Sequence, residues 1–516
     1  MKLFETGSGP TPCKGSSSCF TLYILLLAAH IGLVWLLPYF PTQDGPSHIY
    51  NLAILHDLLN GGKVWGEYYT YNITATPNLG FNLITYPLLS FVTPITAEKV
   101  FLSLYLVLMG IAAPVLIRTF ASPAPYSHTI KLLALPVMFN FTLMMGFYSY
   151  TIAVPAFLLA ISLAWEIRNR SWVVKFVGYN ASGVLVFYLH LIPFIFFLIA
   201  LSIFAIVEKK ITLDSLRSLA KQLICIFPLL ALLLHYFSTG SSSSLPADFF
   251  YLLSGQRAVT LLTDLLTFST VYFSPLQLVP GSIYLFILLL LLRAFVKDLV
   301  KGKHRLYAEQ KAILLLVLTL TAIYLVAPFR LGDGSFFNDR FPWVILLLLL
   351  PLLAGASSLE HPAIKLVITT TVILFLCFNI AIFRQQSNEV ASFLEGLRAD
   401  CSKGEGILLY RTSLPPWAKI DVILHAPSYY GIFNKCVDLG NYEATLPYFP
   451  IRFRMEMGPL PHEAQFAYGY GEIDFSRYPS IEKVLAWDLK PEGKGRLDAL
   501  FNKSYYKGKL SIWSRR

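Results

Sequence analysis

The chain has 516 residues, of which 55% are hydrophobic and 14% are charged, and its mean hydropathy is +0.59. This composition excludes an ordinary soluble protein and indicates a membrane protein that crosses the bilayer many times. The net charge of +11 is typical of basic cytoplasmic loops and of contact with anionic membrane lipids, and no nucleic-acid-binding motif accompanies it.

The first apolar run, 20–40, is uncharged and long enough to cross a bilayer, because a spanning helix needs about 20 apolar residues. Its length and polar flanks favour a retained helix over a cleaved signal peptide. Similar runs recur along the chain, and we predict eleven spanning helices in all. They are 20–40, 97–119, 131–146, 148–166, 173–189, 191–207, 219–238, 276–296, 311–328, 342–357 and 362–383.

The segment 81–93 decides the predicted orientation. Its short length, its prolines and its polar side chains favour an interfacial or re-entrant helix over a span. With that interpretation the three basic clusters, at 168–175, 209–221 and 293–311, lie on one side, which the positive-inside rule makes cytoplasmic. The N-terminal tail, 1–19, is then cytoplasmic and the C-terminus extracytoplasmic.

The composition changes near the C-terminus. Residues 386–516 are rich in charges and prolines and contain no run long enough to span a membrane. Helical periodicity at 390–397, followed by an apolar run at 406–410, predicts a helix that leads into a strand. We therefore predict an all-α polytopic membrane domain at 20–385, with its first outer loop at 41–96, followed by a small extracytoplasmic α/β domain.

One carboxylate, Asp44, opens the segment that follows the first span. A charged group at this depth is costly to place and is often functional. Pro46 is typical of a helix start, so we predict a helix along the membrane surface at 46–60. His48 and Asn51 lie on the same side of this helix as Asp44. The alternative interpretation is that Asp44 only caps the helix.

The predicted topology brings further polar side chains to the same face. Tyr148 lies in a turn between two spans, His190 at the junction of a helical hairpin, and Arg330, Asp339 and Arg340 in the loop before a later span. Each has a simpler interpretation as well. A histidine at a helix end often caps backbone groups, and an arginine before a span often anchors it at the interface.

The six cysteines show no C-x-x-C spacing, so no zinc or redox site is indicated. No motif indicates a divalent metal either, and metal dependence stays open. Cys401 and Cys436 both lie in the predicted extracytoplasmic domain, where oxidation is permitted. We expect a disulfide between them, the alternative being two buried free thiols.

Four segments, PTQDGPSHIYN, MGFYSYTIAVP, FYLHLIPF and NDRFPWVILLLLLP, together with the order of parts, resemble the GT-C glycosyltransferases. This superfamily includes the protein O-mannosyltransferases and the bacterial lipid A aminoarabinose transferases. The resemblance covers roughly residues 20–385. The chain departs from the O-mannosyltransferases at Gly45, where those enzymes carry a glutamate directly after the aspartate. The acceptor class therefore stays open.

The resemblance implies transfer of a sugar from a polyprenyl-phosphate-linked donor to an acceptor, usually with inversion, at the extracytoplasmic face of a bacterial inner membrane. A carboxylate can take the acceptor's proton, and a guanidinium can stabilise the departing lipid phosphate. Asp44 would then be the catalytic base, and Arg340, with Arg330 as the alternate, would bind the phosphate. The residues that would position the substrates are His48, Asn51, His190, Tyr148 and Asp339.

Two other functions stay open. The chain could be a non-catalytic scaffold of a cell-envelope complex with the same fold. A transporter is less favoured, because the predicted spans nearly lack ionisable side chains and no inverted repeat is evident.

Overall fold

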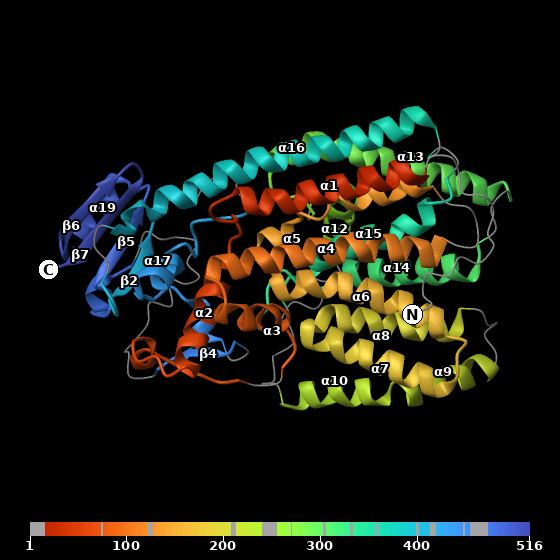
Figure 1. Ribbon diagram of the computed structural model, residues 1–516, viewed down its shortest axis with the longest axis horizontal. Coiled ribbons are helices and arrows are strands. Elements are labelled where there is room, and N and C mark those ends of the chain that lie inside the picture. Colours follow the sequence, from red (N-terminus) through yellow and green to blue (C-terminus); the bar gives the residue numbers. More distant parts are fainter. Residues whose placement is uncertain are drawn as a thin grey trace.

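The computed structural model describes residues 16–73, 76–121, 127–207, 213–239, 255–269, 271–302, 306–330, 334–356, 359, 361–398, 402–412, 419–446, 449–454 and 473–516. Most of the helices run side by side along the long axis of the molecule, and a small sheet lies at one end of this bundle (Figure 1). We call the end next to the sheet the domain end. The opposite end, which carries Arg168, is called the basic end.

Seven helices in the described part of the chain are long and apolar enough to cross a membrane. They are α1 (Ser16–Leu36), α4 (Pro94–Ala121), α6 (Tyr148–Ile167), α7 (Trp172–Leu189), α13 (Leu278–Val300), α14 (Ala308–Val326) and α16 (Pro362–Phe393). Each coincides with a span predicted from the sequence. The protein is therefore an integral membrane protein.

Three further predicted spans are helical but short or bent. α9 (Leu213–Cys225) and α10 (Phe227–Thr239) meet at an angle of 67°, so together they form at most one broken span. α8 (Leu191–Ile206) has 16 residues and α15 (Phe341–Leu353) has 13. Another helix, α12 (Gly255–Thr267), packs on α14.

The prediction of a spanning helix at 131–146 is wrong. This segment begins within the 3-10 helix η3 (His128–Ala134), continues irregularly past Pro136, and ends in the single turn α5 (Phe141–Met144). It still crosses the bundle: Ser127, just before it, donates to the carbonyl of Ala354 at the end of α15, and the carbonyl of Met145 accepts the N–H of Asp44 at the domain end. Nearly all its side chains are buried. Irregular backbone is tolerated at this depth only because protein surrounds it.

The first outer loop folds into short elements at the domain end. It contains α2 (Gly45–Leu59), the 3-10 turn η1 (Trp65–Glu67), β1 (Tyr69–Tyr71), α3 (Gly80–Thr85) and the 3-10 helix η2 (Tyr86–Ser90). The last two span residues 80–90, most of the segment 81–93, and are too short to cross a membrane, in agreement with the interpretation of that segment.

The C-terminal part forms the predicted α/β domain. Its five-stranded sheet has the order β3-β2-β5-β7-β6, in which β2 is parallel to β3 and β5, and β7 is antiparallel to its neighbours. The elements are β2 (Gly406–Tyr410), α17 (Pro427–Asn434), β3 (Val437–Asp438), β4 (Ile451–Phe453), β5 (Lys483–Trp487), α19 (Pro491–Asp498), β6 (Phe501–Lys507) and β7 (Leu510–Arg515). The central strands β2 and β5 are fully buried, as expected for parallel strands that are covered on both faces.

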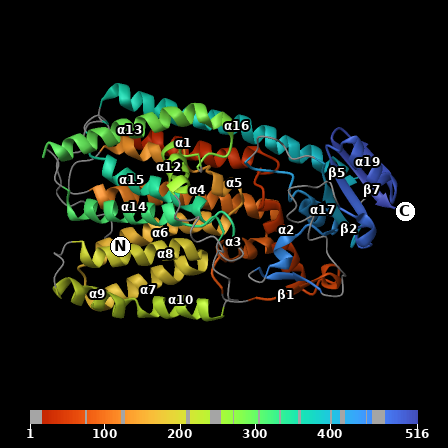
Figure 2. The same cartoon turned by 180° about the vertical axis from the view of Figure 1, so that it is seen from behind.

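The first outer loop and the C-terminal domain are joined into one layer over the domain end (Figure 2). β1 pairs antiparallel with β4, and Tyr69 lies opposite Phe453. The Tyr50 hydroxyl on α2 donates to the carbonyl of Cys436 at 2.9 Å. A Cβ at Gly431 would lie 2.3 Å from the Tyr50 ring, so the glycine allows α17 to approach α2 closely.

Candidate functional site

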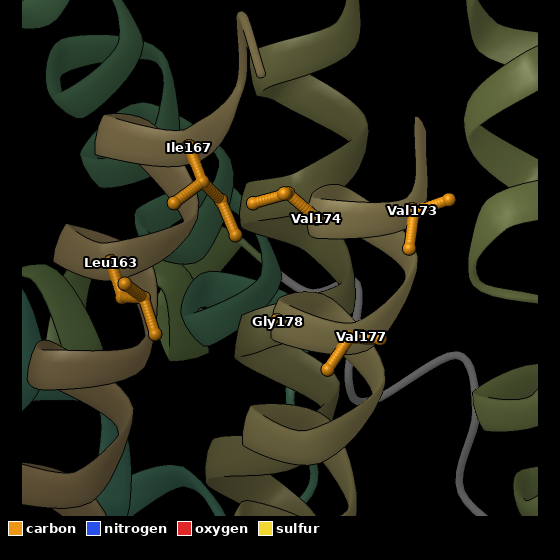
Figure 3. A pocket seen from close by; sticks show the side chains of 6 residues that line it. All are labelled: Leu163, Ile167, Val173, Val174, Val177 and Gly178. Atoms are coloured by element: carbon orange, nitrogen blue, oxygen red, sulfur yellow. The ribbon is translucent and has the colours of Figure 1, made fainter. Parts of the chain in front are cut away.

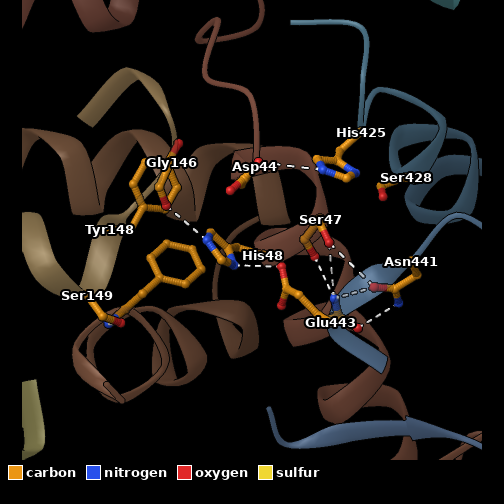
Figure 4. Close-up of polar contacts among 12 residues, drawn as sticks. Asp44, Ser47, His48, Gly146, Tyr148, Ser149, His425, Ser428, Asn441 and Glu443 are labelled. Atoms are coloured by element: carbon orange, nitrogen blue, oxygen red, sulfur yellow. Dashed lines mark hydrogen bonds and ion pairs between the residues drawn. The ribbon is translucent and has the colours of Figure 1, made fainter. Parts of the chain in front are cut away.

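Asp44 precedes α2, but its side chain makes no capping hydrogen bond, so the capping interpretation is wrong. The residue is 7% exposed. Its Oδ1 lies 3.3 Å from Nε2 of Gln43. The same oxygen lies 3.5 Å from Nε2 of His425 (Figure 4). The carboxylate therefore faces a polar cluster and not the first turn of its own helix.

Burial raises the pKa of Asp44 to about 7, while His48 and the hydrogen bond from Gln43 act in the opposite direction. A carboxyl group in this range exchanges its proton near neutral pH, which is the condition for an effective general base. No other carboxylate in the first outer loop was a candidate from the sequence.

His48 lies on α2, one turn after Asp44. Its Nδ1 is 2.7 Å from Oε1 of Glu443, and its Nε2 is 2.9 Å from the carbonyl oxygen of Gly146 (Figure 4). Burial lowers the pKa of His48, but Glu443 and then Asp44 outweigh it and raise the pKa to about 9. His48 is therefore a partly buried cation at neutral pH, with 15% of its side chain exposed.

Two groups of this cluster come from the C-terminal domain. Glu443 lies in the 3-10 helix η8 (Tyr442–Thr445), and His425 lies just before α17. Burial lowers the pKa of His425 to about 3, with His48 and Arg411 acting in the same direction. The neutral ring can donate a hydrogen bond to Asp44. The sequence analysis missed both residues, because no local motif marks them.

A second carboxylate lies beside Gly45, the residue that follows Asp44. Glu98, in the second turn of α4, is fully buried, and its Oε1 accepts a 2.5 Å hydrogen bond from Tyr148, whose hydroxyl also lies 2.7 Å from the Thr42 hydroxyl. A Cβ at Gly45 would lie 2.2–2.6 Å from atoms of these three side chains. The glycine that follows Asp44 therefore makes room for a glutamate from α4, which the sequence analysis did not single out.

Arg340 lies next to this cluster. It ends the 3-10 helix η5 (Asn338–Arg340), and its guanidinium carbon is 4.6 Å from the ring centre of Phe147 and 5.8 Å from that of Tyr150. Phe147 directly follows Gly146, whose carbonyl binds His48. The ring of Phe147 thus lies between the Arg340 guanidinium and the Gly146 backbone, whose carbonyl contacts His48.

The other predicted residues of this end occupy distinct places. His190 packs edge-on against Tyr150, with ring centroids 5.3 Å apart, and its Nδ1 accepts the N–H of Ile192, which is the geometry of a helix cap. Burial raises the pKa of Asp339 to about 6, while Arg340 opposes the shift. Arg330 is exposed on the same loop.

Asn51 faces the C-terminal domain. Its Nδ2 donates to Oδ1 of Asn441 at 3.0 Å, and Nδ2 of Asn441 donates back to Oδ1 of Asn51 at 2.8 Å. The Ser47 hydroxyl also lies 3.4 Å from Asn441 Oδ1. This reciprocal amide pair connects α2 to the turn that carries Glu443.

Cys436 is buried and disulfide-bonded, and its Sγ lies 3.6 Å from the carbonyl of Ser402. Cys401, the residue before Ser402, lies outside the described residues, so its pairing with Cys436 stays a prediction. Cys225 and Cys377 carry free thiols.

An apolar groove of about 410 Å³ lies between α6 and α7 near the basic end (Figure 3). It is lined by Leu163, Ile167, Val173, Val174, Val177 and Gly178. These side chains offer no chemistry, and the groove is separate from the cluster around Asp44. No group of three His, Cys, Asp or Glu side chains that could hold a metal ion occurs in the described part of the chain.

No protein-family model matches the sequence, and no curated protein matches it. Solved structures do match. The crystal structure of ArnT from Cupriavidus metallidurans in the apo state has a TM-score of 0.52 and 10% identity, and the match covers 97% of this chain and 98% of that one. The protein has a GT-C fold. The crystal structure of the same ArnT bound to undecaprenyl phosphate has a TM-score of 0.51 and 10% identity, with 97% of each chain covered.

The GT-C fold expected from the sequence is thereby confirmed. The similarity is wider than the expected range of 20–385, since it includes the C-terminal domain as well. That domain is therefore part of the GT-C-like architecture of this chain and not an unrelated addition.

Proposed function

We propose that the protein is an inverting membrane glycosyltransferase, which moves a sugar from a polyprenyl-phosphate-linked donor to an acceptor at the domain end of the bundle. The observation that carries the proposal is Asp44, a buried carboxylate that caps no helix and has a pKa of about 7. A shared fold alone does not imply a shared activity, so the residues of this site are what support the proposed activity. The undecaprenyl phosphate bound by ArnT supports the class of donor.

In the proposed reaction, the acceptor hydroxyl or amine attacks the anomeric carbon as the bond from that carbon to the phosphate oxygen breaks. Asp44 takes the acceptor's proton, and the electron pair of the broken bond leaves with the lipid phosphate. Nε2 of His425 lies 3.5 Å from the Asp44 carboxylate, and the positive charge of His48 favours the ionised form of Asp44. Both contacts favour an ionised Asp44 that can accept a proton at neutral pH.

Arg340 is proposed to bind the departing phosphate, because a guanidinium matches phosphate geometry and stabilises developing negative charge. Its guanidinium carbon lies 4.6 Å from the ring centre of Phe147, the residue after Gly146, whose carbonyl oxygen contacts His48, and this supports a role close to the polar cluster. Arg330, exposed on the same loop, is the alternate. Tyr148, His190 and Asp339 are proposed to shape the donor and acceptor positions around it.

We propose that the domain end is extracytoplasmic and that the protein lies in a bacterial inner membrane with its N-terminus in the cytoplasm. Arg168 of the first basic cluster pairs with Glu309 at the start of α14, at 3.6 Å. Two basic regions therefore meet at one end, which the positive-inside rule makes cytoplasmic. Cysteines introduced at Arg170 and Lys490 should be labelled from opposite sides, and labelling from the same side would overturn this orientation.

The proposed activity is tested with purified protein in lipid nanodiscs. Mass spectrometry of the bound lipids should find a polyprenyl phosphate. A mixture of sugar-charged polyprenyl phosphates, supplied with envelope lipids as acceptors, should release free polyprenyl phosphate with the wild type and not with Asp44→Asn. A bound carrier lipid without release would favour the scaffold, and absence of both the lipid and the release would refute the proposal.

A further inference from the structure

We propose that Glu443 of the C-terminal domain is a positioning residue that holds His48 as a doubly protonated imidazolium beside Asp44. Docking of the C-terminal domain on α2 thereby sets the charge of the site. The inference rests on the proposed function only where Asp44 acts as the base. The protonation of His48 itself is measurable without any activity.

The geometry of the His48 ring carries the inference. Nε2 lies 2.9 Å from the carbonyl oxygen of Gly146, and a carbonyl oxygen can only accept, so Nε2 bears a proton. Nδ1 lies 2.7 Å from a carboxylate oxygen of Glu443, an ion-pair distance at which a protonated Nδ1 is attracted to the carboxylate. With a carbonyl oxygen at Nε2 and a carboxylate oxygen at Nδ1, the imidazolium is the form of the ring that suits both neighbours.

The position of Glu443 depends on how the domain docks. Two residues before it, Asn441 forms the reciprocal amide pair with Asn51, which lies one turn after His48 on α2. The amide pair fixes η8 against α2 and so places the carboxylate at His48 Nδ1. Glu443 is 1% exposed, so solvent screens the pair little.

Other charged or titratable groups face this pair from the elements packed around it. Glu98 of α4 acts on His48 electrostatically, and so does Asp44. The neutral His425 faces Asp44. Arg411 of the C-terminal domain is held by a bidentate ion pair with Asp421. None of these groups is as close to the His48 ring as the Glu443 carboxylate, which lies 2.7 Å from Nδ1.

Glu443 acts on Asp44 in two opposite ways. Its own charge raises the pKa of Asp44, whereas the positive charge that it holds on His48 lowers it, and the second effect is the larger. Removing the Glu443 carboxylate should therefore shift the pKa of Asp44 in opposite directions in protein that has His48 and in the His48→Gln variant. With His48 present, Glu443→Gln removes both charges and the pKa of Asp44 rises. In His48→Gln, only the direct effect is left, so Glu443→Gln lowers it.

The first measurement is nitrogen NMR of histidine-labelled, full-length protein in nanodiscs at about neutral pH, with the His48 signals assigned by their loss in His48→Gln. The wild type should show two protonated ring nitrogens, and Glu443→Gln should convert one of them to the unprotonated form. Glu395→Gln is the matched control, since it breaks a 3.1 Å ion pair with Lys507 in the same domain away from the site. A neutral His48 in the wild type, or a doubly protonated one in Glu443→Gln, would overturn the proposal.

The second measurement is the pH profile of polyprenyl phosphate release. Glu443→Gln should move the rising limb to higher pH by about 1 unit, the size typical of a neighbouring charge. The same substitution in His48→Gln should move that limb to lower pH. Shifts in one direction in both backgrounds would show a merely structural role and overturn the coupling. If the wild type releases no polyprenyl phosphate, the proposed function fails, and the NMR result decides this inference alone.

Discussion

Nε2 of His425 lies 3.5 Å from Oδ1 of Asp44, although the two residues come from opposite ends of the chain. Asp44 follows the first spanning helix, and His425 belongs to the C-terminal domain. The pair of His48 and Glu443 repeats this relationship at 2.7 Å. The polar cluster is therefore shared between the first outer loop and the C-terminal domain, and it is incomplete without either.

Asp44→Asn should lower the rate of sugar transfer by about 10²–10⁴, the usual loss when a general base is removed. The fold should persist, because the side chain caps nothing and the amide has the same shape. Single-turnover transfer in nanodiscs is the measurement. Asp57→Asn is the control, since Asp57 lies on the same helix and pairs with Lys435 away from the cluster. Wild-type rates in Asp44→Asn would refute the assignment.

The transfer rate should have a bell-shaped dependence on pH. A base must be deprotonated, so the rate rises as pH increases through the pKa of Asp44, about 7. His48 loses its proton as pH increases through about 9; the neutral ring then leaves the Glu443 carboxylate without its cation, the polar cluster is disrupted, and the rate falls. Because the groups interact, the two limbs report the cluster as a whole. A transfer rate that stays constant from below pH 7 to above pH 9 would contradict this account.

Gly45→Ala should impair both stability and transfer. The new Cβ would lie 2.2 Å from Oγ1 of Thr42 and 2.5 Å from the Tyr148 hydroxyl, and overpacking of this kind typically costs about 1–3 kcal/mol. It would also displace Glu98 from its hydrogen bond. Thermal unfolding and transfer should be measured together. Gly32→Ala, where nothing lies within 4 Å of the added Cβ, should be near neutral.

Peptide mapping under non-reducing conditions should find Cys401 linked to Cys436. Cys401→Ser should then destabilise the C-terminal domain by about 2–4 kcal/mol, the usual effect of removing a disulfide. Protease resistance of that domain gives the readout. Cys377→Ser is the control, because Cys377 is free and exposed on α16. A free thiol at Cys401 would end the prediction.

The spanning helices could be predicted because a segment that is buried in a bilayer consists of consecutive apolar residues, which the sequence shows directly. The same signal failed at 131–146, since hydropathy reports whether a segment is buried and not whether it is helical. Pro136 interrupts the helix there, and the surrounding helices satisfy the irregular backbone. The placement of Asp44 directly after the first apolar run can also be read from neighbouring residues alone, and this placement made it the leading candidate for the catalytic base.

The amino-acid sequence by itself determined a polytopic, all-α membrane domain, a C-terminal α/β domain, and the placement of Asp44 at the border of the first span. Only the tertiary structure decided what surrounds that carboxylate. His425 contacts it and Glu443 contacts His48, both from the C-terminal domain, while Glu98 of α4 lies against Gly45. Nothing local in the segments of these three residues marks them. The reason is physical: a pKa depends on burial and on charges within a few ångströms, and those neighbours are chosen by packing between elements that are distant in the chain.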